Sequence, residues 1–196
     1  KYEHYTELFA NALGMHQRNL NLILRDIDQD KAGVLWFATN YGLGRLSPEG
    51  DFQLLKVTTS TDQGSEANYI RNLDIDDQGH LWVATTHAIY RKAIDTDEFT
   101  FISLANIDHF YPAQNQLLIL RAHKDTLWIG TLNGLLKLDM KTGIGKSYFH
   151  QSSNKKSLIN NRVRDILVTQ AGEVWFATHG GISKLSSQGA DAGFTH

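Results

Sequence analysis

The stretch Val34–Thr39 reads VLWFAT, and close variants recur at His80–Thr85 (HLWVAT), Thr126–Thr131 (TLWIGT) and Glu173–Thr178 (EVWFAT). The tryptophan of each copy follows that of the preceding copy after 46, 46 and 47 residues. A fixed period of this length is typical of a repeat protein. We therefore expect four copies of one structural unit in the 196-residue chain.

The repeat extends on both sides of the tryptophan without any insertion. Each copy has an aliphatic residue nine positions before the tryptophan, a small residue six positions after it and a basic residue nine positions after it. These three sets are Ile27, Leu73, Ile119 and Ile166; Gly42, Ala88, Gly134 and Gly181; and Arg45, Arg91, Lys137 and Lys184.

Each copy divides into four short strands. An apolar first strand such as Tyr69–Ile75 ends at an Asp/Gly turn, and the tryptophan block forms the second strand. We expect third strands at 43–47, 89–93, 135–139 and 182–186, and fourth strands from about 52, 99, 144 and 194. This pattern predicts an all-β chain, a β-propeller with four blades of four antiparallel strands. Only Glu7–Gly14 offers a helical turn.

The repeated residues have expected structural roles. The indole should pack against the sheet of the next blade, and the threonine three positions later should hydrogen-bond to neighbouring backbone. We divide the chain, 1–196, into an outer strand plus blade 1 (1–58), blade 2 (59–103), blade 3 (104–150) and blade 4 (151–196). Because Tyr2–Tyr5 and Gly193–His196 both resemble outer strands, one outer strand is surplus. We therefore expect a fragment of a larger propeller that self-associates through open blade edges, with a closed four-bladed ring as the alternative.

Composition excludes several classes of function. Lysine and arginine number 19 against 21 acidic residues, which argues against nucleic acid as a partner. The absence of cysteine removes disulfides, thiolate metal sites and cysteine nucleophiles. Apolar runs such as Leu117–Leu120 are too short to cross a membrane, and the chain opens without an apolar leader.

No motif predicts catalysis, a metal site or a cofactor. The nine histidines lack the spacing of a zinc site. Asp26, Asp28 and Asp30 alternate as in a calcium loop, but no glycine occupies the sixth position. The glycines of Gly42–Ser47 begin like a dinucleotide motif and lack its third glycine.

Candidate ligand-binding residues occur where the inner strands begin and in the turns after the second strands. Arg25, Arg71 and Arg164 share one repeat position, which suits either ion pairing between blades or a polar central channel that meets a ligand. Aromatic rings in nearby loops could stack on sugars or pack locally, and two histidines lie in the turns. The candidates from these two groups are Tyr41, Tyr69, Phe110, Tyr111, His87 and His179. The loop 105–114 is the least repeat-like stretch.

The first copy reads Leu24-x-x-Ile27-x-x-Asp30-x-x-Gly33-x-Leu-Trp-Phe-Ala-Thr39-x-x-Gly-Leu-x-Arg-Leu46, which resembles the two-component regulator propeller repeat. The second copy departs at Ala88, and the third lacks the turn motif, with Ala122 and Asp125 in its place. The resemblance implies the periplasmic sensor region of a bacterial signalling protein. It also implies a seven-bladed propeller, a following transmembrane helix with a histidine kinase or diguanylate cyclase, and a small extracellular ligand such as a glycan.

We therefore expect a periplasmic, non-enzymatic, ligand-binding sensor domain. Two alternatives stay open. The streptogramin B lyase type of propeller has a similar tryptophan block but needs a His/Glu metal site, for which these histidines show no matching spacing. A propeller can also be a scaffold that binds protein, and fold alone does not decide between these functions.

Overall fold

The computed structural model describes residues 5–57, 68–93, 96, 98–110, 116–186 and 193–196. In these ranges sixteen strands form four antiparallel sheets of four, each with its strands in chain order. Sheet I contains β1 (Leu24–Gln29), β2 (Leu35–Thr39), β3 (Gly42–Leu46) and β4 (Phe52–Leu55). Sheet II contains β5 (Asn72–Ile75), β6 (Leu81–Ala84), β7 (Ile89–Lys92) and β8 (Phe99–Ile102). Sheet III contains β9 (Leu117–His123), β10 (Thr126–Thr131), β11 (Gly134–Asp139) and β12 (Gly145–Tyr148). Sheet IV contains β13 (Val163–Val168), β14 (Val174–Thr178), β15 (Gly181–Leu185) and β16 (Phe194–Thr195).

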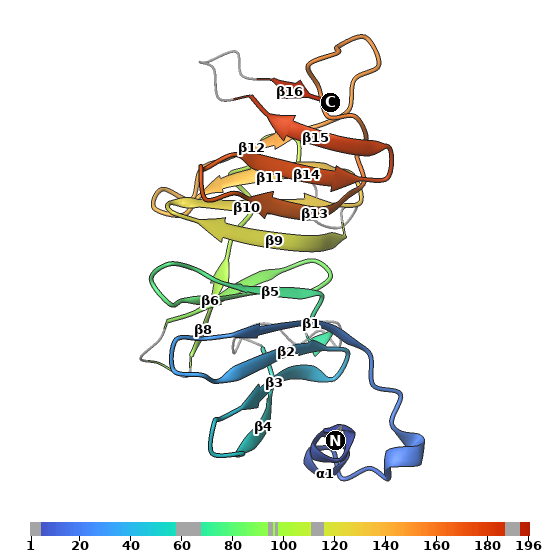
Figure 1. Ribbon diagram of the computed structural model, residues 1–196, viewed down its shortest axis with the longest axis vertical. Coiled ribbons are helices and arrows are strands. Elements are labelled where there is room, and N and C mark those ends of the chain that lie inside the picture. The colour runs from blue at the N-terminus through green and yellow to red at the C-terminus, as the bar shows by residue number, and fades with distance from the viewer. Residues whose placement is uncertain (1–4, 58–67, 94–95, 97, 111–115, 187–192) are drawn as a thin grey trace.

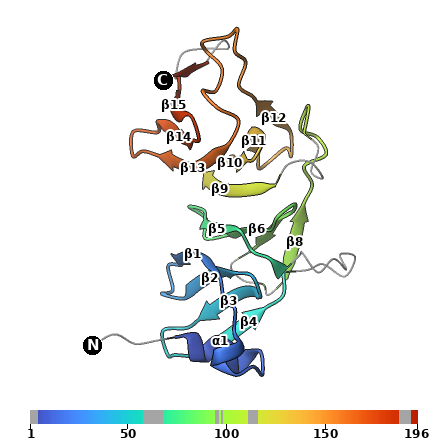
Figure 2. The same ribbon diagram turned by 90° about the vertical axis from the view of Figure 1, so that its right-hand side faces the viewer.

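The four sheets follow one another along the long axis of the molecule (Figure 1). Sheet I and sheet IV lie at opposite ends, and the view from the side shows the same order (Figure 2). The predicted four sheets of four antiparallel strands are confirmed. The closed four-bladed ring, which would bring sheets I and IV together, is not the arrangement observed.

Helix α1 (Thr6–Ala12) and the short 3₁₀ helix η1 (Gln17–Asn19) precede sheet I. The predicted outer strand at Tyr2–Tyr5 falls mostly outside the described residues, and Tyr5 is a turn residue that leads directly into α1. Phe9 of α1 is 4% exposed and lies against sheet I, with its ring centroid 6.0 Å from Phe37 and 4.6 Å from Phe52. In the described part of the chain, no helix is long and apolar enough to span a membrane.

Three of the four tryptophans fill the space between consecutive sheets, as predicted. Trp36 belongs to one buried cluster with Leu73 and Val83 of sheet II. Trp82 packs among residues of sheet III in the same way, and Trp128 packs among residues of sheet IV. These three side chains are only 5%, 2% and 3% exposed, respectively. Burial of a large aromatic surface at each interface is therefore a main source of stability.

In sheets I and II, hydrogen bonds explain why the turn lies at a fixed distance before the tryptophan. Asp76 accepts hydrogen bonds from the backbone N–H groups of Gln78 and His80 and from the indole Nε1 of Trp82, at 2.9, 2.8 and 2.9 Å. Asp30 makes the corresponding bonds in sheet I. One carboxylate thus closes the turn and orients the indole.

The threonine of each block has the predicted backbone role. Its hydroxyl donates to the carbonyl oxygen of the residue three positions later, at 2.7 Å for Thr39, 3.2 Å for Thr85, 2.9 Å for Thr131 and 2.8 Å for Thr178. The glycine that accepts this bond in three of the four copies has a positive φ, for example 135° at Gly42, which glycine adopts at low cost. The threonine and glycine therefore define the turn between the second and third strands.

Candidate functional site

The predicted site residues fall on one edge of the stacked sheets. Leu24, at the start of β1, pairs with Thr39 at the end of β2, and Val163 of β13 pairs in the same way with Thr178 of β14. The starts of the inner strands and the turns after the second strands therefore share an edge, which we call the entry edge. Seven of the predicted site residues lie on this edge: Arg25, Tyr41, Tyr69, Arg71, His87, Arg164 and His179.

Four side chains gather on the entry edge and form what we call the Arg–Tyr cluster: Arg25, Tyr69, Arg71 and Gln116. The Arg25 guanidinium lies 4.7 Å from the ring centroid of Tyr69 and donates a hydrogen bond to its hydroxyl. The Arg71 guanidinium lies 5.3 Å from the same ring and donates to Gln116 Oε1 at 3.1 Å. The tyrosine ring thus contacts two cations, an arrangement that stabilises both guanidinium groups.

The backbone explains why these groups meet. Ile70 is fully buried, and its N–H donates to the Thr39 carbonyl oxygen of sheet I at 2.8 Å. The Arg71 N–H donates to the Ala84 carbonyl oxygen at 2.7 Å. Ile70 therefore fixes its two neighbours at the edge between sheets I and II. Because Gln116 directly precedes β9, the cluster spans the starts of three consecutive inner strands.

The remaining predicted residues do not all join this cluster. The Arg164 Nη2 lies 3.4 Å from the His179 Nε2, and both side chains are exposed on sheet IV. Tyr41 donates its backbone N–H to the Thr39 hydroxyl and is half-buried, as is His87. Phe110 is only 8% exposed and packs in the core between sheets II and III, which agrees with the alternative of local packing. Tyr111 lies outside the described residues.

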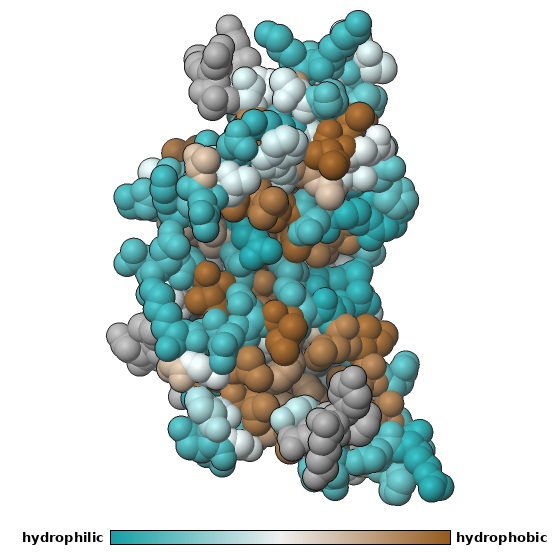
Figure 3. All heavy atoms as spheres, viewed as in Figure 1, coloured by the Kyte–Doolittle hydropathy of each residue, from teal (hydrophilic) through white to brown (hydrophobic). Residues whose placement is uncertain are grey.

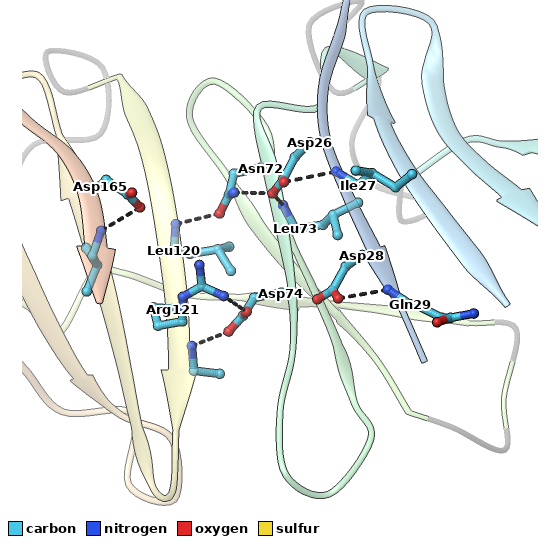
Figure 4. A network of polar contacts seen from close by, with 12 residues as sticks. Asp26, Ile27, Asp28, Gln29, Asn72, Leu73, Asp74, Leu120, Arg121 and Asp165 are labelled. Atoms are coloured by element: carbon cyan, nitrogen blue, oxygen red, sulfur yellow. Dashed lines mark hydrogen bonds and ion pairs between the residues drawn. The ribbon is translucent and has the colours of Figure 1, made fainter. Parts of the chain in front are cut away.

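A ladder of polar side chains links the inner strands (Figure 4). Asp26 of β1 accepts hydrogen bonds from the side-chain Nδ2 of Asn72 and from the backbone N–H of Leu73, the latter at 3.1 Å. Asn72 in turn accepts the backbone N–H of Leu120 in sheet III at 2.7 Å. A second rung joins Asp74 to the Arg121 guanidinium and to the N–H of Ala122 at 2.6 Å.

At the shared arginine position, the contacts of Arg25 and Arg71 therefore differ from the ion pairing between blades that was one of the two expectations. Arg121 does pair with an acid of the neighbouring sheet, Asp74, but Arg25 and Arg71 at the shared position bond to Tyr69 and Gln116 on the entry edge. Sequence reasoning missed Gln116 and Arg121. Only the repeat register could have located Arg121, because it occupies the position in sheet III that Asp74 occupies in sheet II, opposite the tryptophan.

Burial raises the pKa of two carboxyl groups of the ladder, those of Asp26 and Asp74. Desolvation raises the pKa of Asp74 to about 6, although Arg121 and the Ala122 N–H act in the opposite direction. Burial also raises the pKa of Asp26 above its usual value. These groups hold their protons more tightly in the folded chain than in the unfolded chain, so they make folding more favourable as the pH falls through this range.

We expect Asp74 to contribute a measurable pH dependence of stability. Between pH 7 and pH 5 the folded chain takes up a proton at Asp74 that the unfolded chain does not, so this residue should increase the free energy of unfolding by about 1.4 kcal/mol. Urea unfolding of the wild type and of Asp74→Asn at both pH values measures the difference. An equal pH dependence in the two proteins would contradict this assignment.

The described part of the chain shows no cluster of histidine and acidic side chains that could hold a metal ion. A hollow of about 200 Å³ between sheets I and II opens at the opposite edge, lined by residues that include Asp30, Trp36, Arg45 and Lys92. Because Trp36 there is 5% exposed and bonded to Asp30, this hollow belongs to the packing between the sheets.

Comparison with known proteins supports the fold. Residues 157–180 match the family model described as two component regulator propeller, which confirms the resemblance in that copy of the repeat. A search of curated proteins returned no match. The structure is similar to the extracellular domain of BT3049, assigned as a hybrid two component system of B. thetaiotaomicron, with 23% identity and a TM-score of 0.72 over 88% of this chain.

Two further solved structures are similar. The extracellular domain of the system BT4673 from the same organism has 24% identity and a TM-score of 0.70 over 85% of this chain. Virginiamycin B lyase from Staphylococcus aureus has 14% identity and a TM-score of 0.63 over 88% of this chain, and this chain covers 54% of the lyase. The chain spans 22% and 23% of the two extracellular domains. Its fold is therefore that of part of a larger β-propeller, and its residues 157–180 match the two-component regulator propeller repeat.

Proposed function

We propose that the chain is part of the extracellular sensor region of a two-component signalling protein and that the Arg–Tyr cluster contacts the ligand. The observation that carries this proposal is the position of the cluster. It joins the starts of three inner strands on an edge of the array where Arg25 is exposed. The similar extracellular domains of hybrid two-component systems supply the class of function.

The chemistry of the cluster suits a small polar ligand such as a glycan. Guanidinium and amide groups donate hydrogen bonds to hydroxyl or acidic oxygens, and Tyr69 at the centre of the cluster is half-buried, so part of this aromatic side chain is accessible to a ligand. A ligand that contacts Arg25 and Gln116 touches residues from sheets I and III at once. A ligand that binds one arrangement of sheets I, II and III more tightly than another would shift the chain toward that arrangement, which is a means of passing a signal through the propeller.

Removing the cluster should abolish ligand binding with little effect on the fold. Thermal unfolding is measured with a panel of defined oligosaccharides, because a ligand at 100 times its Kd stabilises the folded state by about 2.7 kcal/mol. We expect one oligosaccharide to raise the Tm of the wild type and of Arg91→Ala, but not that of Arg25→Ala or Tyr69→Ala. Arg91 is a matched control because its guanidinium also lies over an aromatic ring, that of Trp82, at 5.7 Å.

Two results would contradict the proposal. If Arg25→Ala and Tyr69→Ala respond to the oligosaccharide like the wild type, or if no oligosaccharide raises the Tm of the wild type, the cluster is not a glycan site. Cleavage of quinupristin that a chelator abolishes would instead support a lyase, since a lyase of similar fold has been crystallised with quinupristin.

A further inference from the structure

A hollow of about 540 Å³ lies between the outer strands of sheets III and IV. It is bordered by β12, by the start of β16, by the turn at His109 and by the loop 151–157 that follows β12. This loop, drawn in orange, reaches the top of the molecule in Figure 1, an end that Figure 3 shows to be covered mostly by hydrophilic side chains. Because three basic side chains border it, we call it the basic hollow.

The charge pattern of the chain is unusual in this region. Residues 140–164 contain six lysines and arginines and no acidic residue, although acidic residues outnumber basic ones in the whole chain, 21 to 19. The basic hollow is bordered by His109, Lys146 and Lys156, and no carboxylate of a described residue borders it. Neither of these lysines forms an ion pair with another described residue. The hollow therefore concentrates positive charge that the described residues do not neutralise.

Hydrogen bonds hold the loop 151–157 in place along one side of the hollow. The Ser157 hydroxyl accepts the backbone N–H of Gln151 at 2.9 Å, which closes the loop. The Lys156 carbonyl oxygen accepts the N–H of Phe194 at 2.7 Å, which ties the loop to β16. Ser157 is 8% exposed and Phe194 is 4% exposed, so both anchors are buried. The backbone that carries Lys156 is thus fixed without any ligand.

His109 lies on a strained turn at the other side of the hollow. Its φ is 59°, a left-handed conformation that is uncommon outside glycine, although histidine adopts it more often than most residues. The turn is anchored by Ile107 and Phe110, which are buried in the core. The Asp108 carbonyl oxygen also accepts the hydroxyl of Ser147 in β12. Backbone strain of this kind clusters at ligand sites, and here it holds an exposed imidazole at the hollow that the two lysines border.

We propose that the basic hollow binds an oxyanion group, sulfate or phosphate, either as the free ion or as an ester of a small molecule. Each lysine ammonium offers three hydrogen-bond donors, and the imidazole of His109 offers a further one. A doubly charged oxyanion between these groups accepts charge-assisted hydrogen bonds and neutralises the hollow.

The size of the hollow favours the ester. About 540 Å³ lies within the range of sites that take small organic ligands, and a lone oxyanion fills only part of it. Tyr148 is half-buried at the hollow, with the Lys146 ammonium 5.2 Å from its ring centroid, so an aromatic surface lies beside the charge.

The basic hollow is separate from the Arg–Tyr cluster. The cluster joins the inner strands of sheets I to III on the entry edge, whereas the hollow lies between the outer strands of sheets III and IV. The two sites share no residue, so the result at one of them does not decide the result at the other.

The test is a titration of the 196-residue chain with inorganic phosphate, inorganic sulfate, glucose 6-phosphate and glucose at constant ionic strength, followed by NMR of the backbone amides. We expect the amide signals of His109, Lys146 and Lys156 to shift with each anion and not with glucose. The Kd of glucose 6-phosphate should be at least about fivefold lower than that of inorganic phosphate, because the ester makes additional contacts. Equal Kd values would instead identify the free ion as the ligand of the hollow.

The double variant Lys146→Gln with Lys156→Gln should raise the Kd of phosphate by about tenfold, because it removes two charged donors. The matched control is Lys141→Gln with Lys155→Gln, which removes the same charge from the same basic stretch at two lysines outside the hollow. We expect the control to bind phosphate within about twofold of the wild type, since screening weakens the effect of more distant exposed charges.

Three results would overturn the proposal. The first is an equal loss of affinity in the double variant and its control, which would mean general attraction to the basic stretch. The second is the absence of amide shifts at His109, Lys146 and Lys156 with every anion. The third is a response to glucose as strong as that to its phosphate ester.

Discussion

Trp82→Ala is expected to lower the free energy of unfolding by about 3–5 kcal/mol, the usual cost of removing a fully buried aromatic side chain. Trp82 is 2% exposed and packs among residues of sheet III, so the change leaves a cavity between two sheets. Urea unfolding followed by circular dichroism at neutral pH measures this effect.

Trp175→Ala is the control for the tryptophan prediction because it removes the same side chain from the same repeat position. Trp175 is half-buried on the face of sheet IV that points away from sheet III, so its loss should cost about 1 kcal/mol. Similar losses from the two substitutions would contradict the view that the tryptophans stabilise the chain by packing against the next sheet.

Asp76→Ala is expected to lower the free energy of unfolding by about 3 kcal/mol, because it leaves several hydrogen-bond donors without an acceptor. The carboxylate accepts from the N–H groups of Gln78 and His80 and from the indole of Trp82, and it lies 3.0 Å from His80 Nδ1. The hydrogen bond from the Trp82 indole to Asp76 is buried. After the substitution, water can replace the carboxylate as acceptor there only at a cost in free energy. Thermal and urea unfolding both report the change.

Asp125→Ala is the matched control for the turn. Asp125 lies in the turn between β9 and β10, where the third copy lacks the motif, and its carboxylate is exposed and pairs with Lys141 at 2.8 Å. Exposed ion pairs contribute little, so we expect a loss below about 1 kcal/mol. If Asp76→Ala costs no more than Asp125→Ala, the carboxylate of Asp76 does not organise its turn.

The repeat pattern predicted most of the sheet architecture because the same residues pack and turn in every copy. Third strands at Leu43 and Ile89 were predicted to within one residue, and the role of Thr39 was predicted correctly. These features depend on alternation and turn chemistry within about twenty residues, which the sequence carries directly.

Contacts between distant residues were harder to predict. The sequence shows that Arg25, Arg71 and Arg164 share one repeat position. The contact of Arg25 with Tyr69, however, depends on how sheets I and II pack on each other. Helix α1 was expected as a single turn, yet Phe9 fixes two turns against sheet I, since tertiary packing supplies most of the stability of a short helix. Gln116 directly precedes β9, and the other repeats have no glutamine at this position. The repeat pattern therefore gave no reason to select it.

The central claim is that one interface between sheets is formed three times and left open once. Solvent paramagnetic relaxation of the four indole ring signals by NMR tests it most directly, after each signal is assigned by substitution. The account predicts weak relaxation of Trp36, Trp82 and Trp128 and strong relaxation of Trp175. Four equally protected indoles would mean that Trp175 is covered as fully as the other three, which would contradict the account.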